Sequence, residues 1–133
     1  MRVAFDSRPA SDPHGVGRYS RCLLRALRDT AAAHGEIIET HRPRHADVFH
    51  SPWMDGAMLH SPCPMVVTLH DLAALKLRSE HLRTSVRPRL RALAVQRATR
   101  VIAPTRALAE DGFAFLGLER GRVVEVSPES LAV

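Results

Sequence analysis

The stretch that decides the fold of this chain is Met65-Val66-Val67-Thr68-Leu69-His70-Asp71. Its first five residues form an apolar, β-branched run, which predicts a strand buried on both faces of a parallel sheet. Two polar side chains, His70 and Asp71, follow this run directly. Ligands of open α/β sheets bind beyond the carboxyl ends of the strands. We therefore expect His70 and Asp71 to lie at a binding site.

Strands and helices alternate along the rest of the chain. Strands are predicted at residues 2–6, 36–40, 47–51, 65–69, 100–104 and 122–126. Helices are predicted from residue 16 or 17 to about 33, from about 81 to 98, and from 106 to about 116. This alternation predicts one α/β domain over residues 1–133, with a Rossmann-like, doubly wound parallel sheet.

Two local patterns refine this prediction. Residues 7–15 are rich in Pro and Gly and are expected to form a loop, long enough to have a functional role. In the second helix, Val86, Leu90, Leu93 and Ala94 recur at helical spacing. This spacing supports the helix predicted from about residue 81 to 98.

The formal charge of +5 favours an anionic partner, such as a phosphate ester or an acidic membrane surface. Lys76 is the only lysine, so arginine carries almost all of the positive charge. Aromatic residues are scarce, and no helix-turn-helix, RNP or zinc-finger pattern is present, so we expect no nucleic-acid partner.

The cysteines, the histidines and the hydropathy of the chain argue against disulfide-bonded, metal-binding and membrane-spanning proteins. Cys22 and Cys63 lack metal-ligand spacing and are expected to be buried free thiols. The eight histidines show no helical pair supported by a carboxylate, so no metal site is predicted. No apolar stretch approaches the ~20 residues that cross a bilayer, and charge begins at Arg2, which favours a cytoplasmic protein.

Several polar residues lie at the carboxyl ends of predicted strands and should meet at one edge of the sheet: Asp6, His50, Ser51, His70, Asp71 and Thr105. The first helix begins at the same edge and presents the amides of residues 15–18. Free N–H groups at a helix start, beside a glycine and a cation, form a phosphate site. Gly15, Val16, Gly17 and Arg18 are therefore the candidate phosphate-binding residues.

Gly15-Val16-Gly17 begins like a dinucleotide fingerprint, but it differs in two respects. It comes about ten residues after the strand, and Ser20 occupies the third glycine position. A nicotinamide or flavin cofactor is therefore not expected.

Five blocks, in this order, carry a resemblance to a known family. They are Phe5-Asp6-Ser7-Arg8-Pro9, Gly15-Val16-Gly17-Arg18-Tyr19, Val48-Phe49-His50-Ser51-Pro52, Val66-Val67-Thr68-Leu69-His70-Asp71-Leu72 and Ala98-Thr99-Arg100-Val101-Ile102-Ala103-Pro104-Thr105. Together they resemble the amino-terminal domain of family-four retaining glycosyltransferases with the GT-B fold. The resemblance covers essentially the whole chain, but only half of such an enzyme.

The resemblance implies a role for each site residue. Residues 15–18 would lie against the diphosphate of a nucleotide-sugar donor, and His70 would reach the transferred hexose. Asp71 would orient His70, and Thr105 would line the same cleft. The acceptor hydroxyl, of a saccharide, lipid or natural product, would be held mainly by this half. These enzymes generally need no metal, so no cofactor is implied.

Members of the family carry a second domain that grips the nucleotide sugar with a Glu-x7-Glu motif. No two glutamates in this chain are eight positions apart. The resemblance therefore implies a carboxy-terminal GT-B domain, in cis or in trans, and a chain that is inactive in isolation.

Two other functions stay open. The chain can be a non-catalytic subunit of a split transferase, binding the acceptor or recruiting the enzyme to a membrane. It can also be an unrelated nucleotide-binding regulator with a flavodoxin-like sheet. A basic helix bears on the first alternative: Arg83, Arg87 and Arg91 share one face, and the region from Arg83 to Arg100 can contact an anionic membrane. A solvated helix surface explains the same pattern.

The single residues have plainer roles as well. His70 and His50 can be strand-end histidines with structural hydrogen bonds, Asp6 can cap the loop that follows it, and the two glycines can serve turn geometry. Arg18 can be solvated surface. Trp53 can line an acceptor pocket or anchor its own loop.

Overall fold

The computed structural model describes residues 1–70 and 86–126. Its strands form one six-stranded sheet with the order β2-β1-β3-β4-β5-β6, and every neighbouring pair is parallel. The strands are β1 (Arg2–Phe5), β2 (Glu36–Glu39), β3 (Val48–Ser51), β4 (Met65–Thr68), β5 (Arg100–Ala103) and β6 (Val123–Glu125). The predicted Rossmann-like α/β fold with a parallel sheet is confirmed.

Three α-helices lie within the described residues: α1 (Gly15–His34), α4 (Val86–Gln96) and α5 (Arg106–Leu116). Short 3-10 helices are η1 (Arg8–Ser11), η2 (Met54–Gly56) and η3 (Arg120–Arg122). The predicted loop at residues 7–15 therefore contains a helical turn, which begins at the Arg8-Pro9 step because proline fixes a helical φ. Of the second predicted helix, the residues before Val86 lie outside the described residues.

Local chemistry explains the ends of these helices. Thr105 caps α5, and its side-chain oxygen accepts a hydrogen bond from the Leu108 amide at 3.1 Å. Gly117 ends α5 with φ 65°, a left-handed conformation that favours glycine. Gly35 ends α1 in a backbone conformation open mainly to glycine, with φ 134°.

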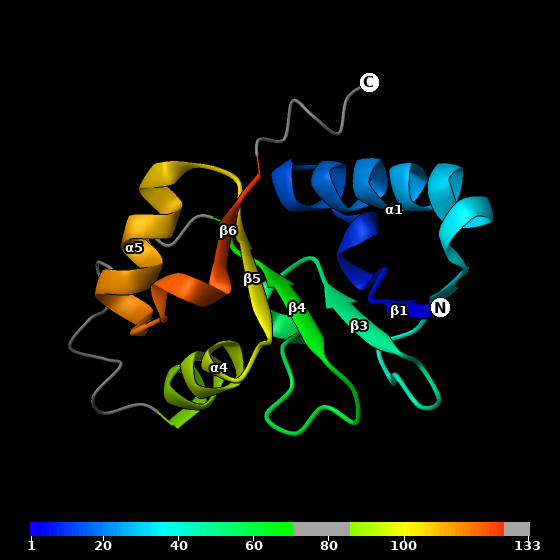
Figure 1. Ribbon diagram of the computed structural model, residues 1–133. Helices are drawn as coiled ribbons and strands as arrows, with labels where there is room; N and C mark the ends of the chain where they lie inside the picture. Colours follow the sequence, from blue (N-terminus) through cyan, green and yellow to red (C-terminus); the bar gives the residue numbers. More distant parts are fainter. Residues whose placement is uncertain (71–85, 127–133) are drawn as a thin grey trace.

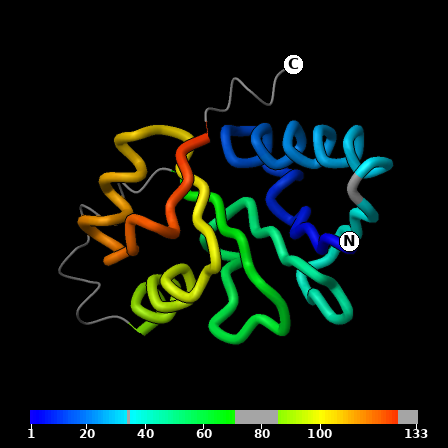
Figure 2. The backbone as a smooth tube through the Cα atoms, viewed as in Figure 1, coloured from blue at the N-terminus to red at the C-terminus, as the bar shows by residue number. Residues whose placement is uncertain are grey.

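The helices cover both faces of the sheet, as the doubly wound prediction requires. The chain crosses from β1 to β2 in one direction and from β3 through β6 in the other (Figure 2). Because parallel crossovers are right-handed, this reversal places α1 opposite α4 and α5 (Figure 1). The side chains of β4 also show that the two faces are covered by different helices. Thr68 contacts Tyr19 of α1, and its neighbour Val67 joins the core on the other face.

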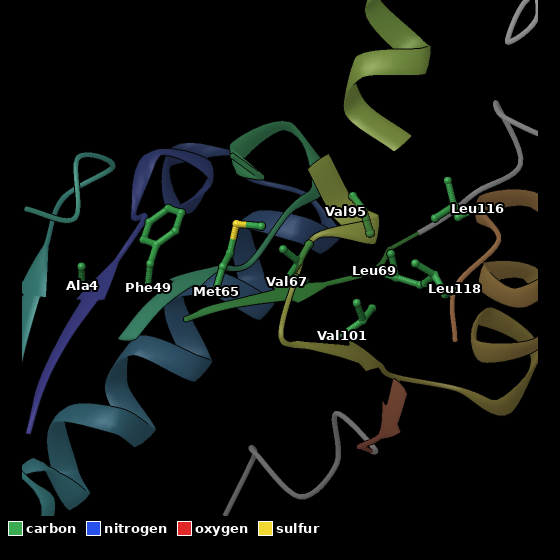
Figure 3. Close-up of a cluster of buried hydrophobic side chains, with 10 residues drawn as sticks. Ala4, Phe49, Met65, Val67, Leu69, Val95, Val101, Leu116 and Leu118 are labelled. Carbon is green, nitrogen blue, oxygen red and sulfur yellow. The ribbon is translucent and has the colours of Figure 1, made fainter. Parts of the chain in front are cut away.

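The main hydrophobic core lies between the sheet and the pair α4 and α5. Ten buried residues form it: Ala4, Phe49, Met65, Val67, Leu69, Val95, Ala98, Val101, Leu116 and Leu118 (Figure 3). Leu69 is fully buried, and its amide donates to Ile102 O at 2.9 Å. Burial of such a side chain contributes about 2 kcal/mol. The core therefore fixes the end of β4, directly before His70.

The four apolar positions that indicated α4 in the sequence do not all face the core. Val86, Leu90 and Leu93 are 68%, 42% and 48% exposed, whereas Ala94 is buried. The helix turns Val95, with no exposed area, into the core instead. Because α4 carries apolar side chains on two stripes, its periodicity did not reveal which stripe packs against the sheet.

Both cysteines are free, but they are half-buried rather than buried. Within residues 1–70 and 86–126, no helix combines the length and the apolar character that a membrane crossing requires.

Candidate functional site

Parallel strands bring the predicted site residues to one edge of the sheet. Asp6 follows β1, His50 and Ser51 end β3, and His70 comes two residues after the last residue of β4. The amide of Asp6 donates to His50 O at 3.0 Å, so these two strand ends are in register. Asp71 lies outside the described residues.

His70 is held by a hydrogen bond to the main chain. Its Nε2 lies 2.7 Å from Pro52 O. A carbonyl oxygen only accepts, so Nε2 carries the proton and donates it. Burial lowers the pKa of His70 below its ordinary value, and the hydrogen bond to Pro52 opposes that change. The imidazole is therefore neutral at neutral pH, and Nδ1 is its acceptor atom.

Asp6 is a buried carboxylate that is bound on both oxygens. Oδ1 accepts from the Arg8 amide at 3.1 Å and from Arg8 Nε at 2.9 Å. Oδ2 accepts from Arg8 Nη2 at 2.8 Å and from Trp53 Nε1 at 3.1 Å. Burial alone would raise the pKa of Asp6, but the hydrogen bonds and charge of Arg8, with the Trp53 bond, lower it. Asp6 is thus an ionised anchor that caps its loop and grips Arg8 in a two-pronged pair.

The turn after β3 packs on this anchor. Ser51 Oγ donates to Trp53 O at 2.6 Å, and the Trp53 indole reaches Asp6. A Cβ at Gly56 would come within 2.4 Å of both Asp6 Oδ2 and Ser51 Oγ, so the turn approaches these atoms more closely than any side chain permits. The Asp6 anchor consequently fixes the turn that presents Pro52 O to His70.

A second polar cluster lies on the α1 face of the sheet. Thr68 Oγ1 is 3.1 Å from Tyr19 Oη and 3.3 Å from His50 Nε2. Burial lowers the pKa of His50 to about 4, so this imidazole is neutral. The Tyr19 ring meets the His70 ring edge to face, with 5.0 Å between their centroids. His50 therefore has a structural partner, and Tyr19 joins this cluster to His70.

The start of α1 gives the two glycines different roles. A Cβ at Gly17 would lie 1.7 Å from Asp12 O, so the loop packs directly on the glycine backbone. A Cβ at Gly15 would meet nothing within 4 Å. Within the described part of the chain, no side chain caps this helix start. Gly17 thus serves chain geometry, while binding of a diphosphate by Gly15, Val16, Gly17 and Arg18 stays a prediction.

The other predicted residues are placed as follows. Arg18 is exposed, Thr105 is exposed and caps α5, and Asp6 and Ser51 have no exposed area. The polar atoms of Asp6 and Ser51 are bound within the protein, and their lining of a ligand cleft stays a prediction. In residues 1–70 and 86–126, no three His, Cys, Asp or Glu side chains are grouped to hold a metal.

Three residues of these clusters were not predicted as site residues: Arg8, Tyr19 and Thr68. Two signals in the sequence point to them. Thr68 is the one hydroxyl within the apolar run that became β4, and Arg8 lies two residues after Asp6, the spacing of a local carboxylate–amide turn. Tyr19 stands in one of the five resemblance blocks without an assigned role, and its contact with Thr68 spans 49 positions.

Two cavities of about 420 Å³ lie away from this edge. They share Gln96, Arg97 and Arg122, and one of them is also lined by Thr99, the residue before β5. Arg122 Nη1 donates to Gln96 O and Ala98 O at 3.3 Å and so closes the end of α4. These cavities belong to the opposite end of the sheet from His70.

The chain was compared with known proteins. No curated protein matches it. The profile of one protein family, described as Glycosyltransferase Family 4, matches residues 3–128, a span that contains the whole sheet except Arg2, the first residue of β1. The chain therefore belongs to glycosyltransferase family 4.

Proposed function

We propose that this chain is the acceptor-side half of a retaining GT-B glycosyltransferase. The parent enzyme transfers a hexose from a nucleotide diphosphate sugar to a hydroxyl of a saccharide, lipid or natural product. The observation that carries the proposal is the imidazole of His70, neutral and fixed at the carboxyl end of β4. The family match and the Rossmann-like sheet, consistent with one half of a GT-B enzyme, support it.

His70 would bind the transferred sugar as an acceptor of a hydrogen bond. Nε2 is committed to Pro52 O, which leaves Nδ1 to accept from a sugar hydroxyl near the reacting carbon. During transfer, the bond from that carbon to the diphosphate breaks and the acceptor oxygen bonds on the same face. The acceptor's proton leaves with the diphosphate. His70 contributes positioning in this reaction, and no protein nucleophile is required.

The first turn of α1 would face the donor diphosphate. Its amides, together with the exposed Arg18, supply the positive end of a helix and a cation, with no metal required. No Glu-x7-Glu pair, the motif that would hold the rest of the nucleotide, occurs within these 133 residues. We therefore expect transfer only when this half meets the domain that carries that motif, in cis or in trans. A cytoplasmic location also stays a prediction.

Transfer of labelled sugar from a set of nucleotide sugars tests the proposal in an enzyme that combines this chain with its donor domain. His70→Ala should lower kcat about a hundredfold, the scale for loss of one preorganised polar contact. His60→Ala is the matched control, because His60 is exposed at the other end of β4. Unchanged kcat in a folded His70→Ala enzyme would refute the role of His70, and turnover by the chain alone would refute the half-enzyme assignment.

A second candidate is membrane recruitment through α4. Val86, Leu90 and Leu93 are exposed along one stripe, with the exposed Arg87 beside them. An apolar stripe flanked by arginine suits the interface of an anionic bilayer. The arginine stripe itself is weaker than predicted, because Arg91 Nε is paired with Asp55 at 3.0 Å and Arg83 lies outside the described residues.

A further inference from the structure

A polar chain crosses the apolar packing between β4 and α1. Thr68 has no exposed area, yet its hydroxyl contacts both Tyr19 Oη and His50 Nε2. His50 is buried as well, and its ring packs on Phe5 with 5.5 Å between centroids. Each hydroxyl both donates and accepts, so the three side chains satisfy one another.

The last member of this hydrogen-bonded series, Tyr19, contacts the imidazole of His70. The Tyr19 ring meets His70 at an interplanar angle of 79°, an edge-to-face contact. Pro52 O binds His70 at Nε2. One hydrogen bond fixes the position of Nε2 but permits the ring to tilt about it. The aromatic contact removes that freedom, because edge-to-face packing has a preferred geometry.

We propose that Tyr19 is a positioning residue for His70, locked by the hydroxyl of Thr68. Tyr19 sets the plane of the imidazole, and Thr68 with His50 sets the position of Tyr19. The inference rests on the proposed role of His70 in sugar binding. It adds residues that touch no substrate and act only through the direction in which Nδ1 points.

A purely structural role for Tyr19 does not explain the polar atoms. A leucine or phenylalanine fills space between a helix and a sheet without any hydroxyl to satisfy. A buried hydroxyl is destabilising when it is left unpaired, so a paired tyrosine and threonine restrict packing to the one arrangement that satisfies both. That restriction is what a fixed imidazole requires.

Nitrogen NMR of the histidine rings in the 133-residue chain tests the inference. In the wild type, His70 should give the signature of a single neutral Nε2–H tautomer, assigned with His70→Gln. Tyr19→Leu should shift His70 to a mixture of both tautomers and make its Nε2 proton exchange about tenfold faster. Tyr19→Phe keeps the ring but loses the hydrogen bond to Thr68, and Thr68→Val breaks the same bond. Both variants should therefore keep the Nε2–H tautomer as the main form and give exchange intermediate between the wild type and Tyr19→Leu.

Leu23→Ala is the matched control, because Leu23 is buried one turn beyond Tyr19 on the same helix. It should lower the melting temperature without changing the His70 signals. The inference is overturned if Tyr19→Leu leaves the His70 tautomer and exchange unchanged, or if Leu23→Ala alters them equally. Should Tyr19→Leu not fold, Thr68→Val decides: wild-type exchange at His70 overturns the inference.

Kinetics separate this inference from the proposed function. In an active two-domain enzyme, Tyr19→Leu should lower kcat at least tenfold and change KM for the acceptor little, and Tyr19→Phe should retain more than half of kcat. Lack of transfer by the wild type with every nucleotide sugar would refute the proposed function alone. The NMR result would still decide whether Tyr19 positions His70.

Discussion

His70 Nε2 and Pro52 O lie 2.7 Å apart and join the ends of β4 and β3. The carbonyl belongs to a turn that packs on the buried carboxylate of Asp6 through Trp53. The position of His70 therefore depends on Asp6, although the two residues are far apart in sequence and no contact between them is required.

Stability should fall as the pH falls from about 6.5 towards 4. The folded pKa of His50 is about 4 against an ordinary value of 6.5, so in this range the unfolded chain binds a proton that the folded chain excludes. Stability is then fully present above 6.5 and decreases below it, by about 3 kcal/mol for a shift of this size. His70, with a lowered pKa, changes stability in the same direction.

Urea unfolding between pH 8 and pH 4.5 measures this effect. His50→Gln should flatten the profile, because glutamine keeps a polar partner for Thr68 and does not titrate. The effect of Asp6 on stability occurs in a different pH range from that of His50. The pKa of Asp6 is lowered from 3.8, so the stability that its carboxylate contributes is lost only below about that pH. An equally steep profile in His50→Gln would contradict the assignment to His50.

Asp6→Asn should destabilise the chain by about 2 kcal/mol, since it weakens charge-assisted bonds to Arg8 and leaves an amide where a buried acceptor is needed. Glu36→Gln is the control. Glu36 pairs with Arg2 on the surface at 3.3 Å, and exposed pairs contribute at most about 1 kcal/mol. Chemical denaturation of both variants compares them, and equal losses would show that the Asp6 pair behaves as a surface pair.

Gly17→Ala should destabilise the chain by about 2 kcal/mol, because its Cβ would collide with Asp12 O and main-chain atoms cannot move aside cheaply. Gly15→Ala should be neutral or stabilising by about 0.5 kcal/mol, since its Cβ meets open space in a helix. Thermal melting checks both. Calorimetry with a nucleoside diphosphate on a two-domain enzyme adds a separate readout: unchanged affinity in a folded Gly17→Ala enzyme would limit this glycine to chain geometry.

Membrane contact through α4 should depend on its apolar stripe as well as on charge. The chain should sediment with vesicles rich in anionic lipid, and the bound fraction should fall as salt rises. Leu90→Ser with Leu93→Ser should release the protein, and Arg87→Gln should weaken binding by about 1 kcal/mol. Val124→Ser is the control, because Val124 is 44% exposed on β6 rather than on α4. Equal recovery of all variants would identify the stripe as ordinary surface.

The strands, their parallel arrangement and the edge of the sheet at which His70 and Asp6 lie were all predictable from the sequence. These features follow from short apolar runs and from the chain direction, both of which are local. The cap at Thr105 was likewise predictable, because its hydrogen bond spans three residues.

Only the tertiary structure decided which stripe of α4 is buried and which partners hold the site. Both outcomes depend on contacts between residues far apart in the chain: Trp53 with Asp6, Tyr19 with Thr68, and Pro52 with His70. Helical periodicity gives the spacing of a stripe but not the rotation of the helix against the sheet. That rotation, and the distances between these side chains, are set when the whole core packs to a single density.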